Sequence, residues 1–154
     1  MTLSNSKLGE ILVEEGLLTE GQLDLALTIQ KTSKSFLGDI ILKKEWVSEG
    51  QLAMALSRQF DLPFVELDFN EIDWNIPQHY TALVIDQHCF PCAQNSASLT
   101  VAIFNPLDAW TMSRIEKQAK GRHVKLVVAT QTKIYAAISE FRKRALHENG
   151  RECA

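Results

Sequence analysis

The clearest candidates for covalent or redox chemistry in this sequence are two closely spaced cysteines. The segment His88-Cys89-Phe90-Pro91-Cys92 contains a CxxC with a proline inside, which resembles a redox dithiol. It stands at the start of a predicted strand, where the two thiols point to opposite faces and no helix N-terminus lowers their pKa. We therefore interpret Cys89 and Cys92 as buried strand residues, with redox or metal use as the alternative.

The usual catalytic signatures are absent from the sequence. It contains no GxxxxGK[ST] phosphate loop, no GxSxG elbow and no HExxH helix. The histidines are scattered without metal-ligand spacing, at His79, His88, His123 and His147. The sequence therefore predicts a protein that is not an enzyme and has no metal site, and favours a regulatory binding module.

Two glutamines are the polar side chains most suited to recognise a ligand. Gln30 and Gln59 each end an otherwise apolar helical stripe. A glutamine on such a stripe must satisfy its amide, because an unpaired buried amide is costly. Each amide either bonds a neighbouring loop or reaches solvent, or it faces a ligand.

An internal repeat places these glutamines at equivalent positions. Residues 7–30 and 36–59 align without a gap at a constant offset of 29 residues. The identical pairs are Leu8/Leu37, Gly9/Gly38, Ile11/Ile40, Leu23/Leu52, Ala26/Ala55, Leu27/Leu56 and Gln30/Gln59. The first sixty residues are therefore a duplicated unit.

Each copy reads as a helical hairpin. Gly16 ends the first helix of one copy in the left-handed conformation, and Glu45 replaces that glycine in the other. Thr19 with Gln22, and Ser48 with Gln51, predict capping boxes for the second helices. The resulting architecture is an N-terminal bundle of four short helices.

The helix starts suggest a ligand with two phosphates. Leu8-Gly9 and Leu37-Gly38 are expected to open helices, where free backbone N–H groups suit anions. Two such starts related by an approximate two-fold match a two-fold ligand, and the leucine stripes offer apolar surface for flat bases. The alternative is a hairpin duplicated for packing reasons alone.

The second half predicts a small α/β subdomain with a mostly antiparallel sheet, so the fold class is α+β. Strands are expected at residues 64–67, 89–93, 99–104 and 124–129, and helices at 77–84 and 106–120, with a last helix capped by Thr130 or Thr132. We expect a duplicated helical subdomain over residues 1–60, the α/β subdomain over 61–145 and a flexible tail over 146–154.

The overall composition indicates which kinds of partner and which location to expect. The chain has 154 residues and a net charge of −3, which argues against a nucleic-acid polymer as partner. Three cysteines, an odd number, and the lack of a signal-type start predict a cytoplasmic protein.

On these residues the sequence resembles a known family, the N-terminal domains of type II secretion and type IV pilus assembly ATPases, in the version that binds cyclic di-GMP. That family uses a 24-residue unit, opening with Arg-Leu-Gly and closing with Gln, twice with a five-residue spacer. Here the spacer is residues 31–35. Ile76-Pro77, residues 101–108 and residues 127–130 are also similar to the family.

The resemblance implies a ligand site across the two repeats. The residues it implies are Lys7, Leu8, Gly9, Leu12, Leu23, Leu27, Gln30, Phe36, Leu37, Gly38, Ile41, Leu52, Leu56 and Gln59. The sequence departs from the family where Lys7 and Phe36 replace the opening arginine, since neither has its planar fork, although Phe36 could stack on a base.

The resemblance also implies partners. Cyclic di-GMP is the implied ligand, with no cofactor, and the output is a secretion or pilus ATPase or a glycosyltransferase, attached or separate. The alternative is a protein-interaction domain with a degenerate nucleotide site, docking on a cytoplasmic domain of an inner-membrane protein.

Overall fold

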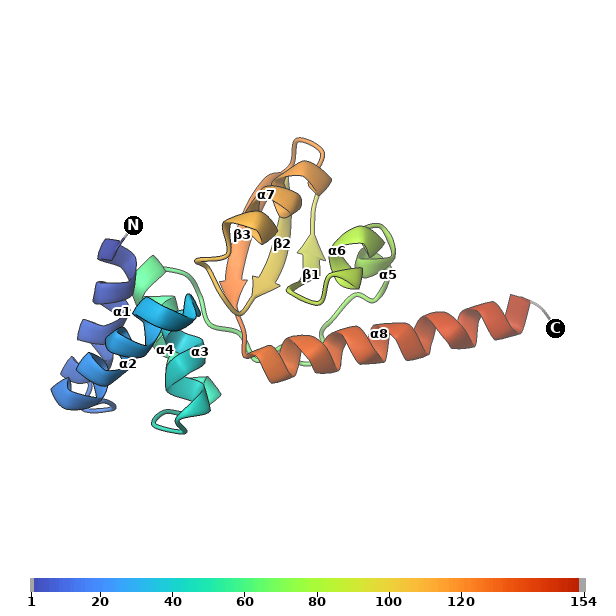
Figure 1. Cartoon of the computed structure of the whole chain (residues 1–154). Helices are drawn as coiled ribbons and strands as arrows, with labels where there is room; N and C mark the ends of the chain where they lie inside the picture. Colours follow the sequence, from blue (N-terminus) through green and yellow to red (C-terminus); the bar gives the residue numbers. More distant parts are fainter. Residues whose placement is uncertain (1, 153–154) are drawn as a thin grey trace. The chain divides into compact units, whose positions relative to one another are not determined.

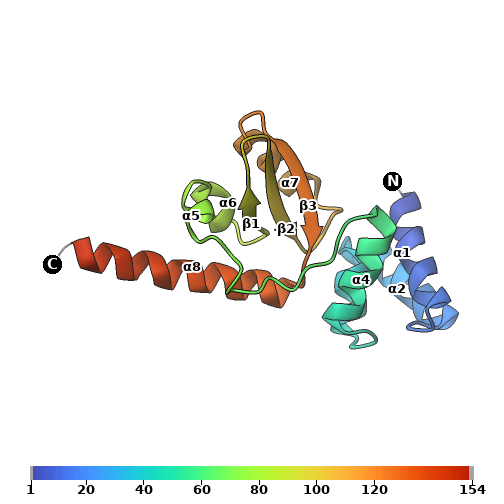
Figure 2. The same cartoon turned by 180° about the vertical axis from the view of Figure 1, so that it is seen from behind.

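The chain divides after Leu62 into two compact units, called here the repeat unit and the sheet unit. The structure, a computed structural model, describes the backbone of residues 2–152 and the side chains of residues 8–148. Figures 1 and 2 show the helices of the repeat unit in blue to green and the sheet unit in green to red. The boundary lies two residues beyond the one expected from the sequence.

The repeat unit is the expected four-helix bundle. Its helices are α1 (Thr2–Glu14), α2 (Glu20–Ser33), α3 (Leu37–Lys43) and α4 (Glu49–Phe60). Helix α1 packs on α4, and α2 packs on α3. The first helix of each repeat therefore contacts the second helix of the other repeat. The internal duplication of the sequence is thus a duplication in space.

Both predicted capping boxes form. The Thr19 side chain accepts from the Gln22 backbone N–H at 3.1 Å, and the Gln22 side chain accepts from the Thr19 N–H at 2.9 Å. Ser48 and Gln51 repeat this pair at 3.1 and 2.9 Å. These bonds satisfy backbone donors at the starts of α2 and α4 that the helices themselves leave unpaired.

The left-handed turn between the helices is kept in both copies. Gly16 has φ 74° and Glu45 has φ 58°. A side chain in this region costs about 1 kcal/mol, because its Cβ approaches the backbone. The second hairpin therefore carries strain that the first avoids.

Substitutions at these two turn positions are expected to change the free energy of unfolding in opposite directions. Glu45→Gly should raise the free energy of unfolding by about 0.5–1 kcal/mol, and Gly16→Ala should lower it by about 1 kcal/mol. Urea denaturation of the two variants measures both effects. A Glu45→Gly protein less stable than the parent would show that the second turn is not strained.

The sheet unit is a three-stranded sheet with helices around it. Its elements are α5 (Asn75–Gln78), α6 (Thr81–Ile85), β1 (Cys89–Gln94), β2 (Ser98–Ile103), α7 (Ala109–Gln118), β3 (His123–Val128) and α8 (Gln131–Glu152). The strand order is β1-β2-β3, with β1 antiparallel and β3 parallel to β2. The α+β class is confirmed, but only one of the two strand pairs is antiparallel, because α7 returns the chain to the same end of the sheet before β3.

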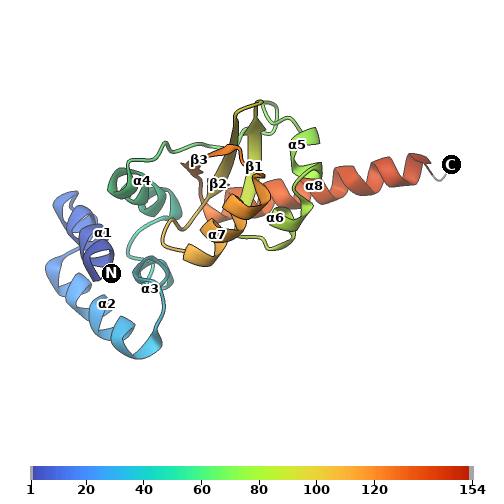
Figure 3. The ribbon, with the colours of Figure 1, turned by 90° about the horizontal axis from the view of Figure 1, so that it is seen from above.

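The core of the sheet unit lies between the sheet and α8. Phe90, Ala102 and Val127 meet Ile134, Ala137, Ile138 and Phe141 of α8 in one buried cluster. Helix α7 lies on the other side of the strands, which stand in front of it in Figure 2. Seen from above in Figure 3, α6 and α7 are neighbours, in agreement with their contacts.

Two segments before the sheet differ from the sequence prediction. Residues 64–67 form a single bridge, Phe64 with Val128, because Leu67 turns the chain with φ 52°. The helix expected over residues 77–84 is split at Tyr80, which has φ −131° and donates its buried hydroxyl to Gln94 at 2.5 Å. Both breaks are fixed by tertiary contacts that local patterns do not contain.

The last helix is longer than expected. It begins after Thr130, whose hydroxyl accepts from the Lys133 N–H at 3.2 Å, and it continues to Glu152. The expected tail over residues 146–154 is therefore helical up to Glu152, and residues 153–154 lie outside the described part. No helix in that part has the length and apolar character needed to span a membrane.

Candidate ligand-binding site

The two repeat-related glutamines occupy half-buried positions near the ends of their helices. Gln30 lies in the last turns of α2 and donates its Nε2 to the Ser35 carbonyl at 3.2 Å. Gln59 lies at the end of α4, and its side-chain oxygen is buried. The Gln30 amide therefore bonds the neighbouring spacer, and a ligand would compete with that bond.

Only one of the two expected helix starts is a helix start. Leu37 and Gly38 are the first residues of α3, and their N-cap Phe36 makes no side-chain capping bond. Leu8 and Gly9 instead lie inside α1, which begins at Thr2. The expectation that Leu8-Gly9 opens a helix was wrong, because residues 2–7 extend the helix by almost two turns and use these N–H groups within it.

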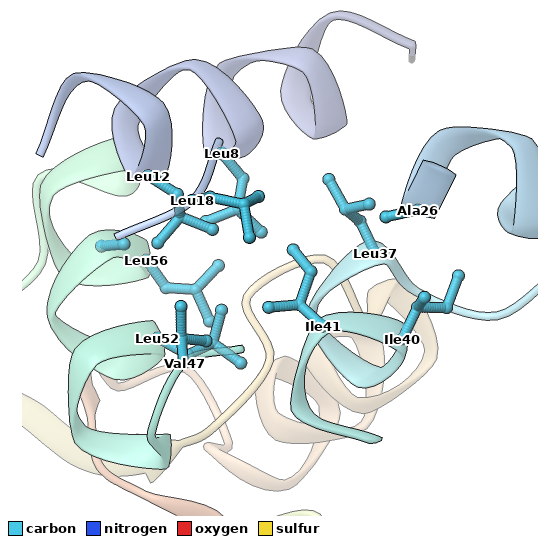
Figure 4. Packing of buried hydrophobic residues seen from close by; sticks show 11 residues of the cluster. Leu8, Leu12, Leu18, Ala26, Leu37, Ile40, Ile41, Val47, Leu52 and Leu56 are labelled. Carbon is cyan, nitrogen blue, oxygen red and sulfur yellow. The ribbon is translucent and has the colours of Figure 1, made fainter. Parts of the chain in front are cut away.

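Six of the expected apolar contact residues form the core of the repeat unit. Their exposed fractions lie between 0% and 7%, for Leu8, Leu12, Leu37, Ile41, Leu52 and Leu56. Figure 4 shows these side chains pointing toward one another between the helices. They hold the four helices together, whereas Leu23 and Leu27 are half-buried and reach the surface.

The repeat-related glycines allow close packing inside each hairpin. A Cβ built on Gly9 would lie 2.5 Å from Leu23 Cδ1, and one built on Gly38 would lie 3.1 Å from Leu52 Cδ2. These distances are shorter than ordinary carbon contacts of about 3.5–4.0 Å. Each glycine therefore lets the second helix of its own repeat approach the first.

At the start of the second repeat, the aromatic residue at the position of the family's arginine is accessible. Phe36 is 41% exposed and directly precedes α3. An exposed ring at a helix start offers a flat apolar face for stacking. The side chain of Lys7, the equivalent position in the first repeat, lies outside the described residues.

The CxxC segment has the geometry of two structural thiols. Burial raises the pKa of Cys89 to about 12 and that of Cys92 to about 11, and the nearby Asp86 carboxylate adds to the shift at Cys89. Their sulfurs donate to different carbonyls, of Leu83 and Thr100. Redox use needs a lowered pKa, so the alternative of a redox dithiol is not supported.

The thiols of Cys89 and Cys92 are expected to be nearly inert at neutral pH. Because both values of pKa are raised, the thiolate fraction at pH 7–9 is very small, and it grows only toward pH 11–12. In a Cys153→Ser background, alkylation by iodoacetamide should be much slower than for a model thiol until the protein is denatured. Fast labelling of the folded protein at pH 8 would contradict this expectation.

Among the residues whose side chains are described, no three histidine, cysteine or acidic side chains gather as metal ligands. The histidines expected to be scattered are all exposed. The local sequence pattern did not predict the ion pair between Glu15 and Arg58, which joins the end of α1 to α4. The sequence signal available for this ion pair was the opposite charge of Glu15 and Arg58, which occupy non-equivalent positions in the two repeats.

Comparisons with known proteins agree with this architecture. The family model of the MshEN domain matches residues 60–148, more than half of the chain. A solved structure of MshE with cdg, the nucleotide cyclic di-GMP, is 26% identical, covers 87% of this chain and 97% of its own, and superposes with a TM-score of 0.77.

A second similar structure is the N-terminal domain of XpsE. It is 18% identical, covers 88% of this chain and 94% of its own, and has a TM-score of 0.66, which shows the shared fold. No curated protein matches the chain by sequence. The structural matches cover both units, whereas the family model covers the sheet unit and the end of α4.

Proposed function

Since this chain belongs to the MshEN domain family, as the duplicated unit predicted, we propose that it is a regulatory module that binds cyclic di-GMP on its repeat unit. The observation that carries this proposal is the similarity to MshE with cdg, which extends over nearly all of both chains. At 87% coverage of this chain the similarity extends into the duplicated helical hairpin, which has two-fold character, as the ligand does.

The proposed contacts are the accessible members of the repeat. Gln30 and Gln59 would hydrogen-bond guanine or phosphate, with Gln30 exchanging its bond to the Ser35 carbonyl for one to the ligand. Phe36 would stack on a base, while the half-buried Leu23 and Leu27 would pack on apolar ligand surface. The buried leucines and Ile41 would support the site from below, and Lys7 would add positive charge.

Ligand binding would act by fixing the arrangement of the two hairpins. A ligand that contacts both repeats binds one arrangement better than others, and it shifts the population by that difference in affinity. The output would be a secretion or pilus ATPase or a glycosyltransferase, attached or separate, in the cytoplasm or at the inner membrane. The repeat unit would thus bind the ligand, and this output would sense the arrangement of its hairpins.

Restoring arginine at position 36 is expected to tighten cyclic di-GMP binding. Phe36→Arg supplies a charged planar fork that bonds guanine or phosphate with two donors, where the ring only stacks. We expect roughly tenfold higher affinity by calorimetry, at one ligand per chain. Leu25→Arg is the control, since Leu25 is 49% exposed but is not among the proposed contacts. Equal gains in both variants would indicate a general charge effect.

The alternative function is a protein-interaction domain whose nucleotide site has degenerated. It is favoured by the departures at Lys7 and Phe36 and by a family model that matches residues 60–148 and not the repeats. Its partner would be a cytoplasmic domain of an inner-membrane protein. Binding of such a partner that needs the sheet unit and ignores cyclic di-GMP would support this function over the nucleotide sensor.

A further inference from the structure

A small groove between α2 and α3 lies beside the residues proposed to bind nucleotide, since its lining includes Ser35, whose carbonyl accepts from Gln30. It encloses ≈ 140 Å³ and is lined by Ile29, Ser33, Ser35, Asp39, Ile40, Lys43 and Lys44. Ile40 is 5% exposed and Ile29 packs against the core, so the floor is aliphatic. Ile40 and Ile41 leave α3 in different directions in Figure 4, and both belong to the core cluster of the repeat unit.

The repeat supplies an internal comparison for this groove. The offset of 29 residues relates Lys44 to Glu15 and Ile29 to Arg58. Between α1 and α4, Glu15 and Arg58 form an ion pair across the equivalent junction. The same positions between α2 and α3 therefore hold a cation facing an isoleucine, with no counter-charge opposite it.

The charges on the rim of the groove are reversed with respect to the first repeat. Glu14-Glu15 corresponds to Lys43-Lys44. Neither lysine forms any of the ion pairs found among the described side chains. Asp39, one helical turn before Lys43, offsets one charge; burial raises the pKa of Asp39 and Lys43 lowers it. Lys44 is left as the uncompensated charge at the groove.

The size of the groove limits what it can hold. Cofactor and nucleotide pockets enclose about 300–1,000 Å³. A groove of ≈ 140 Å³ fits one side chain. An aliphatic floor beneath a lysine suits a side chain with an apolar stem and a carboxylate end.

We propose that the groove between α2 and α3 is a docking site for an acidic side chain of a partner protein. The carboxylate pairs with Lys44, as Arg58 pairs with Glu15 in the other half, and the stem lies on Ile29 and Ile40. Such a contact lets a partner distinguish the two otherwise similar hairpins.

The test uses two peptides that differ in one charge. Acetyl-Leu-Glu-Leu-amide is titrated into the full chain, followed by the NMR signals of the Ile29 and Ile40 methyl groups, with acetyl-Leu-Gln-Leu-amide as the neutral control. We expect saturable shifts in the millimolar range for the glutamate peptide and at least threefold weaker binding for the glutamine peptide. Asp39→Asn should tighten glutamate-peptide binding about two- to fivefold by removing a like charge.

The decisive variant carries an ion pair in this groove, at the positions equivalent to Glu15 and Arg58. Ile29→Arg with Lys44→Glu builds the Glu15–Arg58 arrangement into this groove, so the spectrum should stay folded while peptide binding is lost. Absence of saturable shifts in the parent, equal binding of both peptides, or undiminished binding in the folded transplant variant would each overturn the proposal.

Discussion

Replacing Gln30 and Gln59 together by alanine is expected to weaken cyclic di-GMP binding by about 100-fold or more. Each amide is proposed to hydrogen-bond a charged or strongly polar ligand group, and losing one such bond costs about 1.5–3 kcal/mol. Calorimetry with the purified variant measures the change in Kd. The single variants should each lose roughly tenfold or more, since the repeats contribute equivalent contacts.

The repeat also offers a matched control for this double variant. Leu25 and Met54 are repeat-equivalent residues on the same two helices, 49% and 48% exposed, five residues before the glutamines. Five residues place them about 140° around the helix from the glutamines. Leu25→Ala with Met54→Ala should leave the affinity unchanged. An unaltered affinity in Gln30→Ala with Gln59→Ala would remove the proposed site.

Shortening a buried side chain in the core of the sheet unit is expected to lower the stability strongly. It should leave the proposed ligand contacts of the repeat unit unchanged. Phe90 is fully buried and packs against Trp74 at 6.1 Å between ring centroids. Phe90→Ala should cost about 3–5 kcal/mol, the usual range for removing a buried phenylalanine. Hydrogen exchange should accelerate in β1, β2 and β3 while α1 to α4 keep their protection.

Cyclic di-GMP binding by Phe90→Ala separates the roles of the two units. All proposed ligand contacts lie in the repeat unit, so the affinity should stay within about twofold of the parent. Phe36→Ala is the opposite control, since Phe36 is 41% exposed and its loss should spare stability but weaken stacking. A parallel loss of binding and sheet-unit protection in Phe90→Ala would place part of the site in the sheet unit.

Local patterns predicted most of the secondary structure because the signals are chemically specific. The repeat predicted the positions of the capping residues Thr19 and Ser48. It also predicted the left-handed turns at Gly16 and Glu45. The strands β1 and β2 lie within one residue of their predicted bounds, and the apolar stripe of α8 follows the helical period. These features depend on neighbours in the chain, which a sequence displays directly.

The differences arise where distant contacts decide the conformation. Residues 2–7 contain good capping residues, yet they extend α1 and place Gly9 inside the helix against Leu23. The parallel pairing of β3 depends on where α7 returns the chain, and the break at Tyr80 depends on Gln94. None of these is fixed by the local pattern.

The candidate site illustrates a further limit of sequence patterns. A leucine stripe that packs into a core and one that packs on a ligand have the same spacing. Only the structure distinguishes buried Leu52 and Leu56 from the more accessible Leu23 and Leu27. The two glutamines stay predicted ligand contacts, chosen because a polar residue that ends an apolar stripe in both repeats is an exception to that pattern.

The most direct test of the central proposal is calorimetry of cyclic di-GMP binding to the parent chain, with GMP and ATP as controls. The proposed function predicts saturable binding of one cyclic di-GMP per chain, with Kd in the micromolar range or tighter, and no comparable binding of either control. Absence of binding heat at high ligand concentration, with the protein folded, would contradict the sensor function and favour the interaction domain.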